Sequence, residues 1–417
     1  MTTIHPALLP RNVSLLRHSL QPLARTVMAT RSWASIEASQ LENLRATLDK
    51  KEALGILPAL YATLDPLSIP SADILDALPT TNPPSQLPAA ESAVITLSFL
   101  FSMISNPHFP AAATPDIWPR LCKWVEFLHL YKECFTSTTA IYEDAGATLY
   151  NPAFNIFSAF LDHLPTRQAM SMTDGVRRVL AAGWKAQLQA GTSGTRHDLC
   201  ERLFAMGECL RVLSQLRAVA STTDGAAEFS EILEGCGGSR EALLSVLTRT
   251  ISLITASSKS LGASTFTALG LFLGQIGHFS ITTFQYLLRN GIVSAWMTTL
   301  DIEIPGLPLE SKLKPLVTLL SIPPGYRWVQ EALRAGLLDY LVSTVTKIGS
   351  EPIDDSGHLP TLLGRIFSRS LVFYSVIVEM KEAFSRLENQ ARDENFIRST
   401  LYPMWANLKV LVDERSQ

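Results

Sequence analysis

Apolar residues recur every three or four positions along the chain, whereas alternating runs of β-branched residues are few. The stretch 114–135 is typical, because Trp118, Leu121, Val125 and Leu128 fall on one face of a helix while its charged residues fall mostly elsewhere. A stripe with this period is characteristic of an amphipathic helix that packs against a core. The pattern therefore predicts an all-α protein.

Two segments of the chain repeat one another. LLRNGIVSAWMTTL at 287–300 and ALRAGLLDYLVSTV at 332–345 align without a gap, 45 residues apart, and fainter copies surround two further glycines. In each copy we expect a helix to end at a glycine in the left-handed conformation, with the next helix starting directly after it. The predicted corner glycines are Gly55, Gly183, Gly291 and Gly336.

The repeat decides the expected architecture. Its offset lies within the range of about 40 to 47 residues of armadillo and HEAT repeats. We therefore predict an irregular armadillo/HEAT-like α-solenoid of stacked antiparallel helices, with a compact, non-repeating helical bundle as the alternative, because the faint copies are irregularly spaced. The expected segments are a helical layer at 1–64, a Pro-rich excursion at 65–92 and a continuous α-solenoid at 93–417.

Composition narrows the classes of function. Hydrophobic residues make up 47% of the chain and charged residues 18%, which indicates a folded protein with an extensive core. The 35 basic and 38 acidic residues are well mixed, so no basic footprint for nucleic acid is evident. The five cysteines are irregularly spaced, which favours a reducing compartment, the cytoplasm or the nucleus, over a secreted disulfide framework.

Two segments of the chain suggest a different location for the protein in the cell, the mitochondrion or a membrane. Residues 1–36 contain arginines and no acidic side chain, so a mitochondrial transit peptide is an alternative to a basic first helix. Residues 260–288 lack charged side chains and are long enough to span a bilayer, but Gln275, His278 and many hydroxyl residues argue against insertion. For Gly270 and Gly274 we expect close packing between buried helices.

Cysteine and histidine gather in one place without the pattern of a metal site. Cys122 and His129 share the apolar face of the helix expected at 114–135, but Cys134 falls on another side of it, and no pair of ligands has the tight spacing of a zinc site. We predict no metal site there and expect Thr114 to cap the helix. The glycines around Cys236 predict a flexible loop with an exposed thiol.

Catalytic motifs are missing from the sequence: there is no phosphate loop, dinucleotide fingerprint, paired-histidine zinc motif or nucleophile elbow. The nearest constellation is His197, Cys200 and Glu201 on one predicted helix, where histidine could activate the thiol. A surface His-Glu pair beside a core cysteine is the commoner arrangement. We therefore predict no catalytic residue and no cofactor, and take Asp354 and Asp355 as solvated turn residues.

Three stretches of the chain resemble a known family. These are IHPALLPRNVSLLRHSLQPLARTVMAT, LGILPALYATLDPLSIP and IWPRLCKWVEFLHLYKECF. They are similar to the helical N-terminal region of MYND-type zinc finger domain-containing proteins of mushroom-forming fungi. That resemblance implies a helical scaffold ahead of a zinc module for protein interactions. The paired cysteines of that module have no counterpart here, so no zinc ligand is carried over.

Together these observations predict a non-enzymatic helical scaffold that binds another, unidentified protein, with neither nucleic acid nor a membrane as its partner. One alternative is an enzyme with an unfamiliar site near His197, Cys200 and Glu201. The other is a mitochondrial or membrane-associated structural protein.

Overall fold

A computed structural model describes the chain in eleven stretches and divides it into two compact units. The described residues are 4–48, 50–71, 73, 88–131, 145–189, 196–219, 225–256, 263–300, 308–348, 357–399 and 401–417. All regular structure within these stretches is helical, which confirms the predicted class. Unit 1 is Met1–Gly238 and unit 2 is Ser239–Gln417, so their boundary lies inside the predicted segment 93–417. Of the predicted Pro-rich excursion, residues 72 and 74–87 lie outside the described part.

Unit 1 begins with short helical turns and continues with longer helices. Its 3-10 helices are η1 (Pro6–Leu8), η2 (Pro10–Leu15), η3 (Lys51–Ile56), η4 (Pro66–Ser68) and η5 (Ala111–Ala113). Its α-helices are α1 (Gln21–Thr30), α2 (Ala38–Arg45), α3 (Leu57–Thr63), α5 (Pro88–Ile104), α6 (Thr114–Leu130), α8 (Ala145–Phe160), α9 (Leu164–Ser171), α10 (Val176–Gln189), α11 (Arg196–Val219) and α12 (Gly225–Cys236). The longer helices pack pairwise, α8 on both α5 and α11, and α6 on α9.

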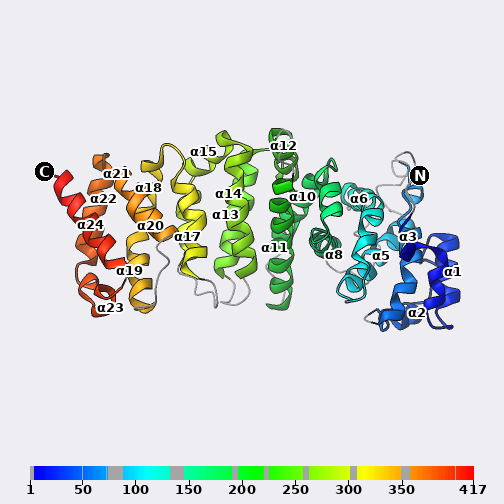
Figure 1. Cartoon of the computed structure of the whole chain (residues 1–417). Helices are drawn as coiled ribbons and strands as arrows, with labels where there is room; N and C mark the ends of the chain where they lie inside the picture. The colour runs from blue at the N-terminus through cyan, green and yellow to red at the C-terminus, as the bar shows by residue number, and fades with distance from the viewer. Residues whose placement is uncertain are drawn as a thin grey trace. The chain divides into compact units, whose positions relative to one another are not determined.

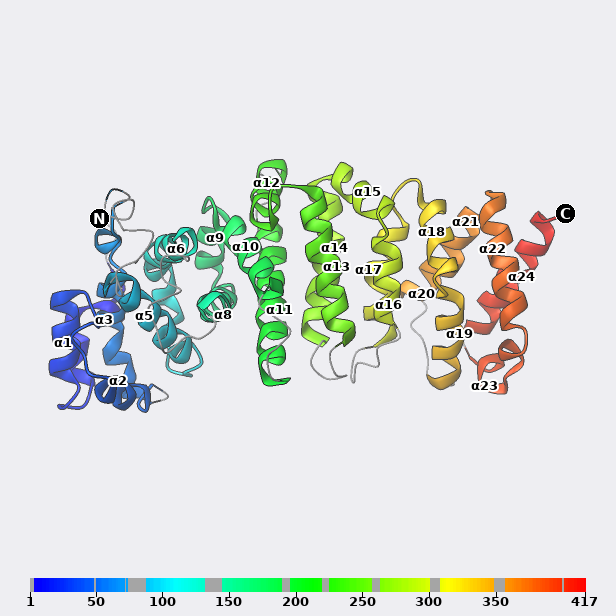
Figure 2. The same cartoon turned by 180° about the vertical axis from the view of Figure 1, so that it is seen from behind.

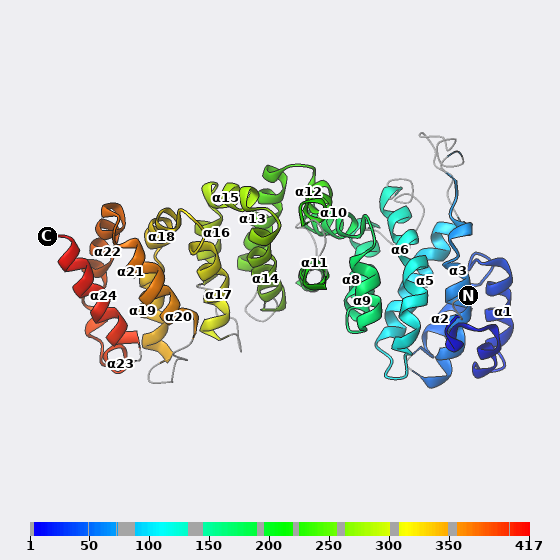
Figure 3. The same cartoon turned by 45° about the horizontal axis from the view of Figure 1, so that its top comes forward.

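Helices α10 and α12 of unit 1 approach each other unusually closely (Figure 3). At Gly235 of α12 a Cβ would collide with the Arg178 carbonyl oxygen and lie 2.7 Å from Ala181 Cβ, so no larger residue fits. Gly183 of α10 leaves similar room for the rings of Phe154 and Tyr150. Both glycines therefore serve close packing between helices.

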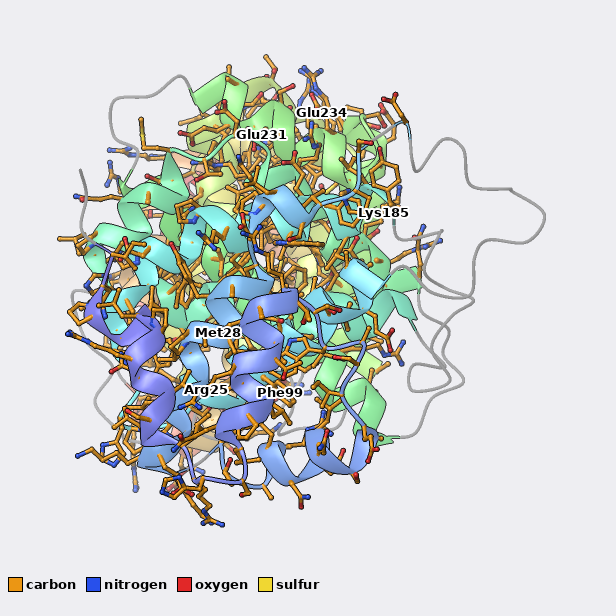
Figure 4. All side chains as sticks on the ribbon, turned by 90° about the vertical axis from the view of Figure 1, so that its right-hand side faces the viewer. Arg25, Met28, Phe99, Lys185, Glu231 and Glu234 are labelled. Carbon is orange, nitrogen blue, oxygen red and sulfur yellow. The ribbon has the colours of Figure 1, made fainter. Side chains whose placement is uncertain are left out.

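A buried ionic cluster also joins α10 to α12. Arg177 Nη2 lies 3.5 Å from Glu228 Oε1, with 4% and 8% of the two side chains exposed. Glu231, which is on α12 with Glu228, accepts hydrogen bonds from the backbone N–H groups of Gly175, at 2.9 Å, and Arg177, at 3.2 Å. Glu231 lies near Glu234 on α12 (Figure 4). Because a charge is costly to bury alone, Arg177 and Glu228 each depend on the other.

The regular structure of unit 2 is also helical in its described residues. Its elements are α13 (Arg240–Ala256), α14 (Ala263–Phe279), α15 (Ile281–Arg289), α16 (Ile292–Leu300), α17 (Leu309–Leu320), α18 (Gly325–Arg334), α19 (Leu337–Ile348), α20 (His358–Pro360), the π-helix η6 (Thr361–Phe367), α21 (Ser368–Ser370), α22 (Tyr374–Leu387), the 3-10 helix η7 (Gln390–Arg392), α23 (Glu394–Ile397) and α24 (Leu401–Arg415).

Packing within unit 2 follows the order of the chain. Helix α13 contacts α16, α14 contacts α17, α17 contacts α18 and α20, and α18 contacts α22. Figures 1 and 2 show α13 and α14 at one side of unit 2 and α22 and α24 at the other. Aromatic side chains fill the interior, with Phe266 against Trp296 at 4.8 Å between ring centroids and Phe384 against Trp405 at 4.6 Å.

The two strong copies of the predicted repeat have the same local structure. Helix α15 is followed by Gly291, with φ 86°, and then by α16; helix α18 is followed by Gly336, with φ 88°, and then by α19. A positive φ is the left-handed conformation that a side chain makes unfavourable. The predicted glycine corners at these two positions are confirmed.

The two faint copies are wrong as corners. Gly183 lies inside α10, and Gly55 lies inside η3, where a Cβ would be 2.9 Å from Asn12 O. Other described glycines with a positive φ, which the repeat does not indicate, are Gly175 (79°) ahead of α10 and the pair Gly237 (125°) and Gly238 (83°) ahead of α13. An isolated glycine in a sequence does not tell whether it supplies a torsion angle or room for a neighbour.

Within the uncharged segment 260–288, residues 263–288 are divided between α14 and α15, which meet at Ser280. The Ser280 hydroxyl accepts a hydrogen bond from the Thr283 N–H and so caps α15. A Cβ at Gly270 would lie 2.5 Å from Pro315 Cγ of α17, so close packing holds there, but nothing lies within 4 Å of one at Gly274. In the described stretches, no helix has both the length and the apolar character to cross a membrane.

Candidate binding groove

Unit 2 contains a groove of about 550 Å³ beside α19, which we call the α19 groove. Its lining comes from the end of α16, the corner between α18 and α19, the outer face of α19, and the turn between α22 and α23. The lining residues are Met297, Ala335, Gly336, Asp339, Tyr340, Ser343, Thr346, Lys347, Gln390 and Asp393.

The sequence of α19 separates its two faces. Leu337, Leu338, Leu341, Val342 and Val345 are buried, at the spacing of one helical stripe. The opposite face carries carboxylate, phenol, hydroxyl and ammonium groups and lines the groove. The left-handed corner at the start of α19 lets its first turn follow α18 directly, which places this polar face beside the corner.

Both signs of charge meet in the groove. Asp339 Oδ2 accepts a hydrogen bond from Arg386 Nη2 at 2.9 Å, and this bond raises the pKa of the Arg386 guanidinium above its usual value. Asp393 accepts the backbone N–H of Asn395 at 2.8 Å and so caps α23. Lys347 is exposed, and no ion pair holds it within the described residues. The groove thus offers hydrogen-bond donors and acceptors to a polar ligand or to a peptide backbone.

The described residues that line the groove include neither histidine nor cysteine. Its two carboxylates already accept hydrogen bonds, Asp339 from the Arg386 guanidinium and Asp393 from the Asn395 N–H. Over the described residues, no group of three or more His, Cys, Asp or Glu side chains could hold a metal ion. The arrangement is suited to binding.

The predicted cysteine and histidine pair on α6 belongs to the core stripe of that helix. His129 Nδ1 is hydrogen-bonded to the Tyr150 hydroxyl at 2.6 Å. Burial, with Glu126 and Glu231 nearby, raises the pKa of the Cys122 thiol to about 12. Such a thiol stays protonated at neutral pH and is a poor nucleophile and metal ligand. Cys134 lies outside the described residues.

The predicted cap of α6 is wrong. Thr114 is the first residue of the helix, and no side chain caps it from the preceding position, Ala113. The Thr114 hydroxyl instead donates to the Ala111 carbonyl oxygen at 2.6 Å and is hydrogen-bonded to Thr166 Oγ1 at 2.6 Å. Its place at the contact between α6 and α9 explains why it is buried.

The prediction for Cys236 is also wrong. The residue ends α12, is fully buried and lies next to the glycine corner that follows it. Burial raises the pKa of its thiol to about 12, although Lys185 acts in the opposite direction. The glycines that follow it, Gly237 and Gly238, have positive φ values of 125° and 83°.

Other predicted positions lie beyond what the structure describes. The backbone of His197, Cys200 and Glu201 belongs to α11, but their side chains lie outside the described ones. Asp354 and Asp355 also lie outside the described residues. These predictions stay predictions.

Sequence reasoning missed the α19 groove, although part of its signal was present. The second repeat copy contains Asp339, Tyr340 and Ser343 between the leucines that form its apolar stripe. These positions predict an exposed face, but the contributions of Gln390 and Asp393 depend on how α22 and α23 pack against α19.

Comparison with family models, with curated proteins and with solved structures finds no match for this chain. The resemblance to MYND-type zinc finger domain-containing proteins therefore stays a prediction.

Proposed function

We propose that this protein is a non-enzymatic helical scaffold of the armadillo/HEAT type, and that its α19 groove binds a segment of another protein. The proposal favours an α-solenoid over a compact bundle. It is supported by the shared form of α15 with α16 and α18 with α19, and by the packing of successive helices in unit 2. Helices stacked in this way bury one continuous core and leave an extended surface for a partner.

The observation that carries the proposal is the composition of the groove. A repeat corner, at Ala335 and Gly336, forms part of its wall, and the polar face of α19 forms another part. Hydroxyl groups at Ser343 and Thr346, with the amide of Gln390, can pair with the backbone of an extended peptide. The binding site is thus a consequence of the repeat.

The test compares proteins captured by three forms of the full chain from extracts of its own cells. In the groove variant, Ser343→Arg and Thr346→Arg fill the groove with two long side chains. In the control variant, Ser245→Arg and Ser252→Arg place the same change on exposed positions of α13. Quantitative mass spectrometry measures which proteins each form retains.

We expect the unchanged chain and the control variant to retain the same reproducible set of proteins, and the groove variant to lose at least one of them. Circular dichroism checks that all three forms have equal helix content. Retention of the whole set by the groove variant, or no reproducible set for the unchanged chain, contradicts the proposal.

A further inference from the structure

Unit 2 carries a second exposed feature, separate from the α19 groove, which we call the aromatic patch: Tyr326, Val372, Phe373 and Tyr374. The last three are consecutive in the chain, and 68%, 39% and 77% of their respective surfaces are exposed. Their neighbour Leu371 is fully buried and anchors the segment. Contiguous large apolar side chains on a surface are a mark of an interaction site.

The patch is held in shape by two helices that lie side by side, α18 and α22 (Figures 1 and 2). Tyr326 is in the first turn of α18, and Phe373 is directly ahead of α22. Their rings stack at 3.7 Å between centroids, with 17° between the planes. This stacking fixes the segment that carries Val372 and Tyr374, so a partner would bind to a preformed surface.

The two segments that carry the patch contain basic side chains and no acidic ones. Residues 321–330 and 368–378, which carry the patch, contain Arg327 and Arg369 and no Asp or Glu. Arg327 Nε donates to the Tyr326 hydroxyl at 3.3 Å, and within the described chain neither arginine forms an ion pair. Further along the same two helices, by contrast, Arg334 is paired with Glu379 at 2.5 Å.

We propose that the aromatic patch binds an acidic peptide segment of another protein. The segment places a large apolar side chain against Val372 and Tyr374 and its carboxylates near Arg327 and Arg369. Burial of the apolar contact supplies affinity, and charge-assisted hydrogen bonds to the guanidinium groups select the acidic sequence.

Single-stranded nucleic acid is the rival occupant, because aromatic rings and arginines also bind bases and phosphates. Two observations favour the peptide. The Tyr326 and Phe373 rings are stacked on each other, so one face of each is already covered. The chain has a net charge of −3, which repels a polyanion, whereas a short acidic peptide needs only the local pair of arginines.

The experiment selects random dodecapeptides displayed on phage against the immobilised full-length protein, and then measures binding of the enriched peptides by fluorescence anisotropy. We expect enriched peptides to be net acidic and to contain at least one aromatic or large aliphatic residue. The combined variant Arg327→Glu and Arg369→Glu, and separately Val372→Asp, should each weaken binding by about tenfold or more, as at an interface hot spot.

Matched controls change the same chemistry elsewhere in unit 2. Arg249→Glu alters an exposed arginine of α13, and Val410→Asp alters an exposed valine of α24. Neither control should change the affinity by more than about twofold, because surface substitutions away from a site are nearly neutral. The groove variant Ser343→Arg with Thr346→Arg should also bind the peptides normally, which separates this proposal from the proposed function.

Three results overturn the proposal: enrichment of neutral or basic peptides, or of none; equal affinity of the patch variants and the controls; and binding of an oligothymidylate or oligouridylate in place of acidic peptides. Because the side chains altered in the patch variants and in their two matched controls are exposed, each of these variants should keep the unfolding midpoint of the unchanged protein, and a thermal unfolding scan checks this.

Discussion

The region around α10 in unit 1 and the corner between α18 and α19 in unit 2 use glycine and charge in opposite ways. In unit 1, Gly183 leaves room for two aromatic rings, and the pair of Arg177 with Glu228 is buried. In unit 2, Gly336 supplies a left-handed backbone angle, and the ion pair of Arg386 with Asp339 is largely exposed. The difference shows that neither a glycine nor an ion pair makes the same contribution to stability at every position. Its contribution depends on whether its surroundings demand space, a torsion angle or the neutralisation of a buried charge.

The largest difference between the units should come from their ion pairs. In unit 1, Glu228→Ala leaves the Arg177 guanidinium buried without its carboxylate partner, so we expect the free energy of unfolding to fall by about 3–5 kcal/mol. Urea denaturation followed by circular dichroism measures this loss.

The matched variant in unit 2 is Asp339→Ala. Because 52% of Arg386 and 39% of Asp339 are exposed, water replaces the lost partner, and we expect a loss below about 1 kcal/mol. Equal losses in the two variants would remove the contrast between the buried and the exposed pair.

The next largest loss of stability should come from replacing a glycine that leaves space for neighbouring side chains. In Gly183→Ala the new methyl group would collide with Phe154 and lie 2.6 Å from Tyr150 Cδ1, so α8 and α10 must move apart. Overpacking of this kind costs about 1–3 kcal/mol. Differential scanning calorimetry measures the change. A gain in stability would mean that the aromatic rings yield without strain, and that the tight approach in unit 1 is not a constraint.

The smallest change in stability should come from replacing a glycine in the left-handed conformation. Gly291→Ala meets no neighbour within 4 Å, so its cost comes from the backbone alone, about 1 kcal/mol for the left-handed conformation. Gly274→Ala is the control, since that position lies inside α14 with open space around it, and alanine should stabilise the helix by up to about 1 kcal/mol. Urea denaturation of both variants should give opposite signs. The same sign would show that backbone angle does not distinguish the two glycines.

These contrasts also mark how far the sequence could predict the structure. The helical class and the corners at Gly291 and Gly336 were predictable, because local periodicity and a repeated glycine report on backbone conformation. The roles of Gly183 and Cys236 were not, because they depend on contacts with residues that the sequence does not place nearby.

The candidate surfaces show the same limit. The polar face of α19 could be predicted from the spacing of Asp339, Tyr340 and Ser343. The aromatic patch could not, because its stacked rings belong to Tyr326 and Phe373, which come together only when α18 packs on α22. Apolar residues in a sequence are expected in the core, and only the packing shows which of them stay outside.

The corner glycines have one more consequence, which concerns handedness. A φ of 88° at Gly336 is the mirror image of an ordinary helical angle, so a residue of opposite chirality would adopt it without strain. A D-alanine at that corner should fit as well as glycine does, and it would restrict the unfolded chain more than glycine does. At such a corner a D-residue fits the backbone best. Glycine, which is achiral, is the natural amino acid that takes its place.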